Sequence, residues 1–244
     1  MLKLNCDLGE SYSLYRLGND QAVMPLIDQA NIACGFHAGD PSVLHQTLKL
    51  AIAHQVDIGA HPSYDDKPGF GRRSVSMSSE ELRDLIWYQI AAVDGVARTL
   101  GGRVCYVKPH GALYNDMMRS PQLLQTVMQA VAAYHSQPAL MLLSDANRAL
   151  HQQRADQLGL TLYFEAFADR RYQVDGSLTP RSQPGAVLTE AQALAQVRLL
   201  LTQGLLEASD GSKIALQADS LCVHGDTPSA LAMLQQIRQS LGSD

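Results

Sequence analysis

The stretch from Val104 to Asn115, which reads V-C-Y-V-K-P-H-G-A-L-Y-N, most constrains how this chain can fold. It opens with apolar residues that favour β-structure, as in a buried strand. Lys108 and His110 follow directly, and the proline and glycine beside them shape a turn. The sequence therefore predicts a strand whose carboxyl end delivers a cation and an imidazole.

The same arrangement, an apolar run followed by a histidine or carboxylate beside glycine, recurs along the chain. It is found at Leu4–Glu10, Ile32–Asp40, Ile58–Ser63 and Leu221–Asp226. Parallel strands present their carboxyl ends on one face, and in a parallel βα fold that face holds the active site. We therefore expect the polar groups to converge there and the protein to be an enzyme.

Seven predicted strands alternate with helices. The strands are expected at Leu2–Asp7, Ala30–Cys34, Val56–Ala60, the start of the Val104 stretch, Ala139–Leu143, Thr161–Phe167 and Ser220–His224. The helices are expected at Asp20–Ala30, Asp40–His54, Ser78–Leu100, Ser120–Tyr134, Asp145–Leu158, Thr189–Thr202 and Thr227–Leu241. This alternation favours an α/β fold with a parallel sheet, and polar ends on nearly every strand favour a barrel over an open doubly wound sheet. No linker divides the chain, so we expect a single domain over residues 1–244.

Two long polar loops, His61–Met77 and Ala168–Gly185, interrupt this pattern. Loops of this length in compact domains are usually functional. Each carries a pair of arginines, whose guanidinium groups suit a carboxylate or phosphate, although solvated loop charges are an equal alternative. The pairs are Arg72 with Arg73 and Arg170 with Arg171.

Composition excludes several classes of function. The net charge of -5 comes without a basic stripe, which gives no reason to expect binding to nucleic acid or to an anionic membrane. The chain enters a strand at once and has no long uninterrupted apolar run, so a cytoplasmic location is expected. The cysteines lie in predicted strands without a C-x-x-C spacing, which favours buried free thiols.

Histidines and carboxylates are the candidates for chemistry. Four histidines are expected just past strand ends: His37, His61, His110 and His224. Imidazole serves both general acid–base catalysis and metal ligation, and Asp7, Glu10 and Asp226 could complete either kind of site. Each group also has a structural alternative, such as a helix cap, a solvated charge or, for Lys108, an ion pair. The compact metal, phosphate-loop and nucleophile-elbow motifs are absent from the sequence.

Six ordered blocks give the chain a resemblance to the LamB/YcsF family over essentially its whole length. The blocks are Asn5–Glu10, Asn31–Asp40, Gly59–Asp66 with Gly69–Arg73, Lys108–Asn115, Glu165–Tyr172 and Cys222–Asp226. The resemblance implies a distorted TIM-like barrel with about seven parallel strands, related to the glycoside hydrolase and deacetylase superfamily. It also implies ATP-dependent cleavage of 5-oxo-L-proline to L-glutamate, with Mg²⁺ accompanying ATP, in a complex with 5-oxoprolinase subunits B and C.

Carried over to this sequence, the resemblance gives two sets of site residues. The expected catalytic residues are Asp7, His61, Lys108, His110 and His224. The expected substrate-binding residues are Asn5, Glu10, His37, Arg72, Arg73, Glu165, Arg170 and Asp226. A tightly bound metal is left open; if one is present, Asp7, His61 and His110 are its expected ligands.

Two other functions remain open from the sequence. One is an autonomous metal-dependent hydrolase similar to a deacetylase, which would bind a divalent metal and act without partners. The other is a scaffold protein within the complex that binds the ligand while its partners make and break bonds.

Overall fold

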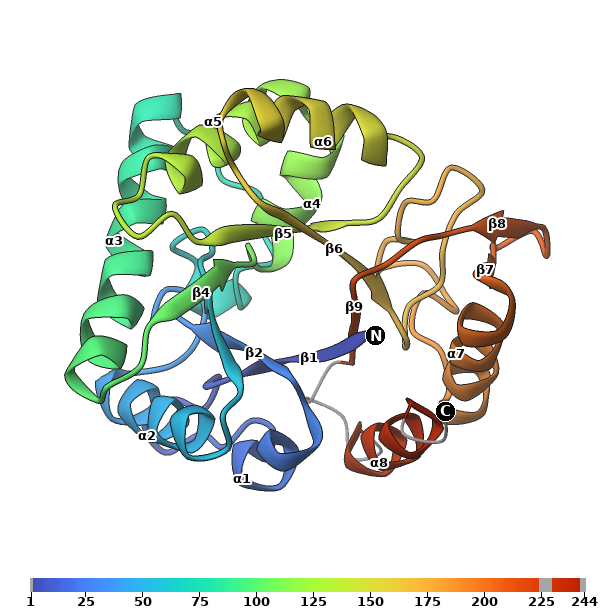
Figure 1. Ribbon diagram of the computed structural model, residues 1–244, viewed down its shortest axis with the longest axis horizontal. Coiled ribbons are helices and arrows are strands. Elements are labelled where there is room, and N and C mark those ends of the chain that lie inside the picture. Colours follow the sequence, from blue (N-terminus) through green and yellow to red (C-terminus); the bar gives the residue numbers. More distant parts are fainter. Residues whose placement is uncertain (1, 224–229, 242–244) are drawn as a thin grey trace.

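The computed structural model describes residues 2–223 and 230–241. Seven parallel strands close into a barrel, in the order β1-β2-β3-β4-β5-β6-β9 (Figure 1). They are β1 Lys3–Leu8, β2 Gln29–Ala33, β3 Asp57–His61, β4 Val104–Val107, β5 Ala139–Leu143, β6 Leu162–Phe167 and β9 Ser220–Cys222. The last strand pairs with both β6 and β1 and so closes the ring. The predicted TIM-like barrel is confirmed.

Helices surround the barrel and shield its strands from solvent (Figure 1). They are α1 Asp20–Val23, α2 Pro41–Ala53, α3 Ser79–Thr99, α4 Gly111–Arg119, α5 Pro121–Ala132, α6 Arg148–Gln157, α7 Glu190–Gln203 and α8 Ala230–Leu241, with 3₁₀ turns η1 Met24–Leu26 and η2 Lys67–Gly69. A small antiparallel hairpin, β7 Leu205–Glu207 with β8 Lys213–Ala215, forms the predicted excursion before β9. No helix among the described residues is long and apolar enough to cross a membrane.

Most helix starts follow the capping signals in the sequence. The Asp40 carboxylate accepts from the backbone N–H groups of Ser42 and Val43, with Pro41 in the first turn. Ser78 and Glu81 form the expected capping box of α3. These short-range hydrogen bonds satisfy backbone donors that have no partner within the helix, which explains why the sequence located the starts well.

Two predicted helices differ from the structure, and one further helix was not predicted. The helix expected at Asp20–Ala30 is one turn of α-helix followed by a 3₁₀ turn that contains Pro25, because proline cannot donate to a helical hydrogen bond. Helix α4 was not predicted and begins directly after His110. Helix α6 begins at Arg148 rather than Asp145, because Asp145 accepts from the Asn147 N–H in a preceding turn.

A polar path runs through the barrel interior. The ring of Tyr106 fills the space beside Gly59, where any side chain would collide with it, and the β3–β4 register shifts there. The Tyr106 hydroxyl donates to Asn31 Oδ1 over 2.6 Å. Asn31 in turn donates from Nδ2 to the side chains of Asn5 and Asp7, at 2.8 Å each. The buried path therefore leads to the carboxyl end of the barrel.

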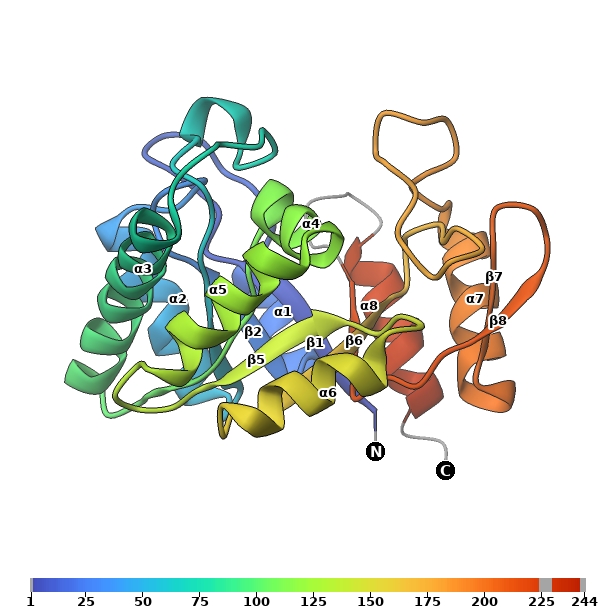
Figure 2. The same ribbon diagram turned by 90° about the horizontal axis from the view of Figure 1, so that it is seen from above.

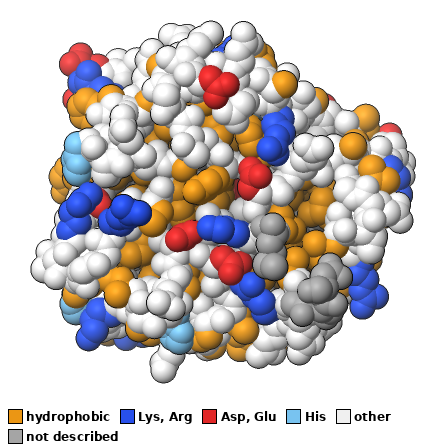
Figure 3. All heavy atoms as spheres, in the orientation of Figure 1, with side chains coloured by type: hydrophobic (Ala, Val, Ile, Leu, Met, Phe, Trp, Pro, Cys, Tyr) orange, Lys and Arg blue, Asp and Glu red, His pale blue; other side chains and the backbone are white. Residues whose placement is uncertain are grey.

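Different parts of the chain lie at the two ends of the barrel. Long loops stand beyond the carboxyl ends of the strands, while the chain termini lie at the opposite end (Figure 2). Figure 3 shows this opposite face, where charged side chains of both signs gather near the centre. Two ion pairs form there, Lys3 with Asp57 at 2.7 Å and Arg238 with Asp28 at 2.9 Å.

Candidate active site

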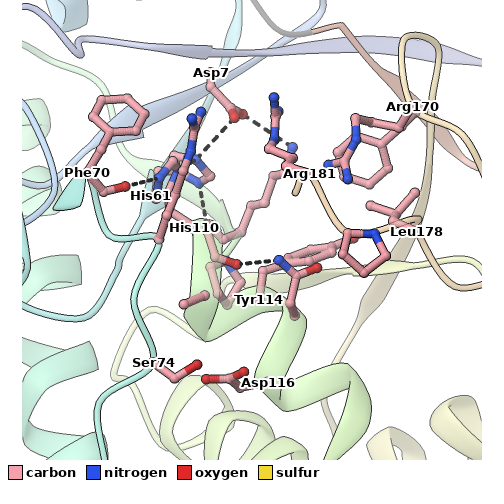
Figure 4. Close-up of a pocket in the computed structure, with 18 of the residues that line it drawn as sticks. Asp7, His61, Phe70, Ser74, His110, Tyr114, Asp116, Arg170, Leu178 and Arg181 are labelled. Carbon is pink, nitrogen blue, oxygen red and sulfur yellow. Dashed lines mark hydrogen bonds and ion pairs between the residues drawn. The ribbon is translucent and has the colours of Figure 1, made fainter. Parts of the chain in front are cut away.

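A pocket of about 330 Å³ opens at the carboxyl end of the barrel (Figure 4). Its walls come from the ends of β1, β3, β4 and β6, from α4 and from both long loops. The lining residues with ionisable side chains are Asp7, Glu10, His61, Arg72, Lys108, His110, Tyr114, Asp116, Arg119, Arg170 and Arg181. Residues from distant parts of the chain thus meet at the face predicted to hold the site.

Three histidines and a glutamate form a buried group that we call the imidazole cluster, composed of Glu10, His37, His61 and His110. His61 Nε2 lies 3.0 Å from His110 Nδ1, and His37 Nε2 lies 3.2 Å from Glu10 Oε1. The rings of His37 and His110 stack with centroids 3.8 Å apart. Each member lies at or just past the carboxyl end of a different strand, so the barrel itself brings them together.

The loop after β3 holds the cluster in place through unusual backbone. Phe70 adopts a left-handed conformation with φ of 55°, and its carbonyl accepts from His110 Nε2 at 3.0 Å. Gly71 has φ of 63°, and a Cβ there would lie 2.8 Å from His37 Cβ and 2.9 Å from His110 Cδ2. Only glycine allows this loop to press against both rings.

Burial strongly affects the charge of these rings. It lowers the pKa of His37 and of His110 well below the ordinary histidine value, and the neighbouring histidines lower each pKa further. Both rings are therefore neutral at neutral pH. His110 lines the pocket and can accept a proton there, which is the property required of a general base.

Lys108 sits at the centre of a second buried group, the lysine network, composed of Lys108, Asn5, Asp7, Glu165 and Cys222. Its Nζ lies 3.0 Å from Glu165, 3.3 Å from Asp7, and 3.1 Å from both Asn5 Oδ1 and Cys222 Sγ. Burial lowers the pKa of Lys108, but the negative charges of Asp7 and Glu165 outweigh it and raise that pKa well above its ordinary value. Lys108 is thus an ion-paired cation and also a lining residue of the pocket.

Asp7 connects the two groups. Its Oδ1 faces Lys108, and its Oδ2 lies 3.4 Å from His61 Nε2 (Figure 4). A carboxylate in this position orients the imidazole and stabilises a positive charge that develops on it.

Arginines form the outer wall of the pocket. They are Arg72, Arg119, Arg170 and Arg181. Arg170 is only 6 % exposed and donates to the carbonyl oxygens of Thr179 and Ala186. Burial, and then the positive charge of Arg181, lowers the pKa of Arg170 to about 10. Guanidinium groups that repel one another favour an anionic ligand, which would relieve the repulsion.

The structure separates the expected site residues into those that line the pocket and those that support it. Asp7, Glu10, His61, Arg72, Lys108, His110 and Arg170 line it. Asn5 and Glu165 lie fully buried in the lysine network, and His37 lies behind the ring of His110. Arg73 is 67 % exposed at its side chain, pairs with Asp66 and does not line the pocket. His224 and Asp226 lie outside the described residues.

Sequence reasoning missed several lining residues. Arg119 and Tyr114 lie on α4, the helix that was not predicted. Arg181 and Thr179 lie in the second long loop, whose arginine pair was the available signal. The Tyr114 hydroxyl and Thr179 Oγ1 are buried and make no hydrogen bond within the described structure. Buried hydroxyl groups without partners at a pocket wall are available to a ligand.

Comparison with known proteins shows which family this chain belongs to. The model of the LamB/YcsF family matches residues 2–244. The chain belongs to the LamB/YcsF family. The A subunit of 5-oxoprolinase from Pseudomonas fluorescens strain Pf-5 is 55% identical over 241 residues, which cover 98% of this chain and 96% of that protein. The A subunit of 5-oxoprolinase from Vibrio cholerae is 49% identical, covering 98% of this chain and 97% of that protein.

Two solved structures resemble the fold of this chain. The lactam utilization protein from Thermus thermophilus matches with a TM-score of 0.89 and 37% identity, covering 98% of this chain and 95% of that one. A putative cellobiose-phosphate cleavage protein from Enterococcus faecalis V583 matches with a TM-score of 0.57 and 11% identity, covering 97% of this chain and 90% of that one. The second likeness concerns the barrel alone.

Proposed function

We propose that this chain is the A subunit of an ATP-dependent 5-oxoprolinase and holds the lactam while its ring is opened. The names of its relatives and of the Thermus structure support a role in lactam chemistry. In the proposed reaction, 5-oxo-L-proline, ATP and two waters give L-glutamate, ADP and phosphate. Subunits B and C are the proposed partners, and Mg²⁺ accompanies ATP as the co-substrate of the complex.

The observation that carries this proposal is the pairing of imidazoles with a wall of cations around one pocket. A five-membered lactam is a stable amide, so it needs both activation and charge stabilisation to be opened by water. Phosphorylation of its oxygen at the expense of ATP makes the ring carbon open to attack. The arginine wall and Lys108 would neutralise the carboxylate of the substrate and the added phosphate.

His110 and His61 are the proposed acid–base pair. His110 borders the pocket as a neutral ring that can accept a proton from water. His61 lies 3.0 Å away and is oriented by Asp7, so it can pass a proton toward the leaving ring nitrogen. Cleavage of the ring C–N bond then leaves an amine and an acyl phosphate, and the second water hydrolyses the acyl phosphate to a free carboxylate and phosphate.

The test is glutamate formation by the chain reconstituted with subunits B and C in the presence of 5-oxoproline, ATP and Mg²⁺. His110→Ala is expected to lower turnover by about 10²–10⁴-fold, the usual contribution of a positioned acid or base. His151→Ala is the matched control, because His151 is equally buried, pairs with Asp145 at 3.3 Å and lies on α6 outside the pocket. Near-normal turnover by the His110 variant would remove this residue from the mechanism.

The same assay separates the two alternative functions. An autonomous hydrolase would act without subunits B and C, whereas the proposed component releases glutamate only in the complex. A scaffold protein would still bind 5-oxoproline, but turnover by the complex would tolerate His61→Ala and His110→Ala. Loss of turnover with retained binding of the partners would instead place the chemistry on this chain.

A further inference from the structure

The imidazole cluster contains contacts between atoms that cannot hydrogen-bond to each other. A backbone carbonyl only accepts, so His61 Nδ1, 2.6 Å from the Lys108 carbonyl, must carry its proton. By the same reasoning His110 Nε2 carries the proton that it donates to the Phe70 carbonyl. If each ring carries a single proton, its other nitrogen has a lone pair and no hydrogen. These two, His61 Nε2 and His110 Nδ1, face each other across 3.0 Å.

His37 repeats this pattern on the other side of the cluster. The Ser63 hydroxyl gives its single proton to the Tyr64 carbonyl at 2.9 Å, so its oxygen accepts from His37 Nδ1 at 3.1 Å. The lone pair of His37 Nε2 is then directed at Glu10 Oε1, 3.2 Å away, which is also an acceptor. Two acceptor-to-acceptor contacts therefore lie side by side in a buried site, and Asp7 Oδ2, 3.4 Å from the same His61 Nε2, adds a third.

Such contacts are repulsive unless positive charge lies between the atoms. Two extra protons would place at least one imidazolium between His61 and His110 and a second proton between His37 and Glu10, in one buried cluster with two rings stacked. A single dication would accept all the lone pairs at once. From this arrangement we infer that Glu10, His37, His61 and His110 bind one divalent transition-metal ion.

The spacing of the donor atoms fits this ligand. All four lie within 4.8 Å of one another. A tetrahedral ion with bonds of about 2.1 Å holds its donors about 3.4 Å apart. The contacts of 3.0 and 3.2 Å, and the 3.9 Å between His110 Nδ1 and Glu10 Oε1, bracket that separation. The carbonyl and hydroxyl partners of the outer nitrogens fix the rings, as is usual for histidine ligands.

The chemistry of the donors narrows the choice of metal. Three imidazole nitrogens and one carboxylate suit Zn²⁺ and its transition-metal neighbours, whereas Mg²⁺ and Ca²⁺ prefer oxygen ligands. The ligand set differs from the Asp7, His61 and His110 expected from the sequence. Asp7 Oδ1 is occupied by Lys108 and Asn31, while Glu10 and His37 complete the cluster.

Glu10, His61 and His110 also line the pocket, so the ion would border the substrate. There it would polarise a carbonyl or phosphoryl oxygen. When the ion is bound, His61 and His110 would be its ligands and could not also act as the acid–base pair. The polarising role rests on the proposed function, but the binding of the metal does not.

The test uses the full chain, treated with a chelator, dialysed against metal-free buffer and then titrated with Zn²⁺, Co²⁺ or Mg²⁺. Bound metal is measured by mass spectrometry, Co²⁺ ligation by visible absorption, and stability by melting temperature. We expect about one equivalent of Zn²⁺ or Co²⁺ per chain, a raised melting temperature and no comparable effect of Mg²⁺. Glu10→Gln and His37→Asn should each weaken binding at least about tenfold, because loss of even an outer hydrogen-bond partner of a ligand costs about that much. His151→Gln, a buried histidine outside the cluster, should bind as the wild type does.

Two results would overturn the inference: a chelated wild-type chain that takes up no Zn²⁺, or Glu10→Gln and His37→Asn variants that bind it like the wild type. Glu10→Gln keeps the size of the side chain, and a metal-free melting temperature equal to that of the metal-free wild type shows that it folds. A chain that binds Zn²⁺ in a complex that makes no glutamate would refute the proposed function alone. Glutamate formation without any Zn²⁺ binding would refute the metal site alone.

Discussion

The two ends of the barrel carry similar charged residues in opposite environments. At the end where strands begin, Lys3 and Asp57 pair with side chains 47% and 38% exposed. At the carboxyl end, Lys108 and Glu165 pair with side chains 3% and 0% exposed. Exposed pairs contribute about 0–1 kcal/mol, whereas removal of one partner from a buried pair costs about 3–5 kcal/mol. The comparison teaches that a lysine–carboxylate pair is buried at the end that holds the pocket, whereas the corresponding pair at the other end stays exposed.

The largest effect should come from Lys108→Met, which would leave the carboxylates of Asp7 and Glu165 buried without their cation. We expect the free energy of unfolding to fall by about 3–5 kcal/mol, against at most about 1 kcal/mol for Lys3→Met at the other end. Denaturant unfolding of both variants measures the difference. Equal losses would contradict the contrast between the two ends.

A double variant sharpens this result. Lys108→Met combined with Glu165→Gln removes one of the two stranded charges, because the buried Glu165 carboxylate becomes a neutral amide. Part of the lost stability should return while turnover by the complex stays low, since the cation at the pocket is still missing. A double variant that is no more stable than Lys108→Met alone would show that Glu165 is not the stranded charge.

Gly71→Ala and Gly159→Ala compare a glycine with close neighbours, at the pocket, with a glycine that has none. Gly71 and Gly159 share a φ of 63°, but a Cβ at 159 would meet no atom within 4 Å. Both alanine variants carry the left-handed backbone cost of about 1–2 kcal/mol. Gly71→Ala should lose about 2 kcal/mol more, because it also displaces His37 and His110. Chemical denaturation of the pair gives this difference, and equal stability would mean that the rings move aside freely.

Arg181→Ala tests whether the arginines of the pocket wall bind the ligand, and Arg103→Ala, at the opposite end of the barrel, is its control. A charge-assisted hydrogen bond is worth about 1.5–3 kcal/mol, so kcat/KM for 5-oxoproline should fall by about 10–100-fold in the complex. Arg103→Ala, at an exposed position directly before β4, should leave kcat/KM unchanged. Arg181 is exposed, so the melting temperature should stay constant in both. A normal kcat/KM for Arg181→Ala would exclude this side chain from ligand binding.

A small effect on stability is expected for Tyr114→Phe. Burial raises the pKa of Tyr114 well above its ordinary value, and the nearby negative charge of Glu165 raises it further. Its hydroxyl makes no hydrogen bond within the described structure, so its removal should change stability by less than about 0.5 kcal/mol. Tyr172→Phe should instead cost about 1–3 kcal/mol, because the Tyr172 oxygen accepts from the buried Phe167 N–H at 2.7 Å.

Activity gives this pair of tyrosines a second readout. If the Tyr114 hydroxyl is reserved for the ligand, kcat/KM should fall about tenfold without a loss of stability, the size of one neutral hydrogen bond. A Tyr114→Phe variant as unstable as Tyr172→Phe would show that its hydroxyl already has a structural partner.

The sequence by itself determined the seven-stranded barrel and the end at which chemistry takes place. Strand periodicity, helix caps and the residue following each strand are local signals, and the parallel arrangement sends all those residues to one face. His61, Lys108 and His110 were identified in this way, whereas the family was indicated by the resemblance of six ordered sequence blocks. The free cysteines also follow from composition and spacing.

Only the tertiary structure decided which of these groups contact one another. Glu10 and His37 join the imidazole cluster and Arg73 turns to Asp66, because loop backbone beyond each strand sets the direction of its side chains. The left-handed residues Phe70 and Gly71 fix that direction in one loop, and no periodic pattern encodes it. Which ring nitrogen carries a proton depends on carbonyl groups distant in sequence, so the site for a metal becomes visible only in three dimensions.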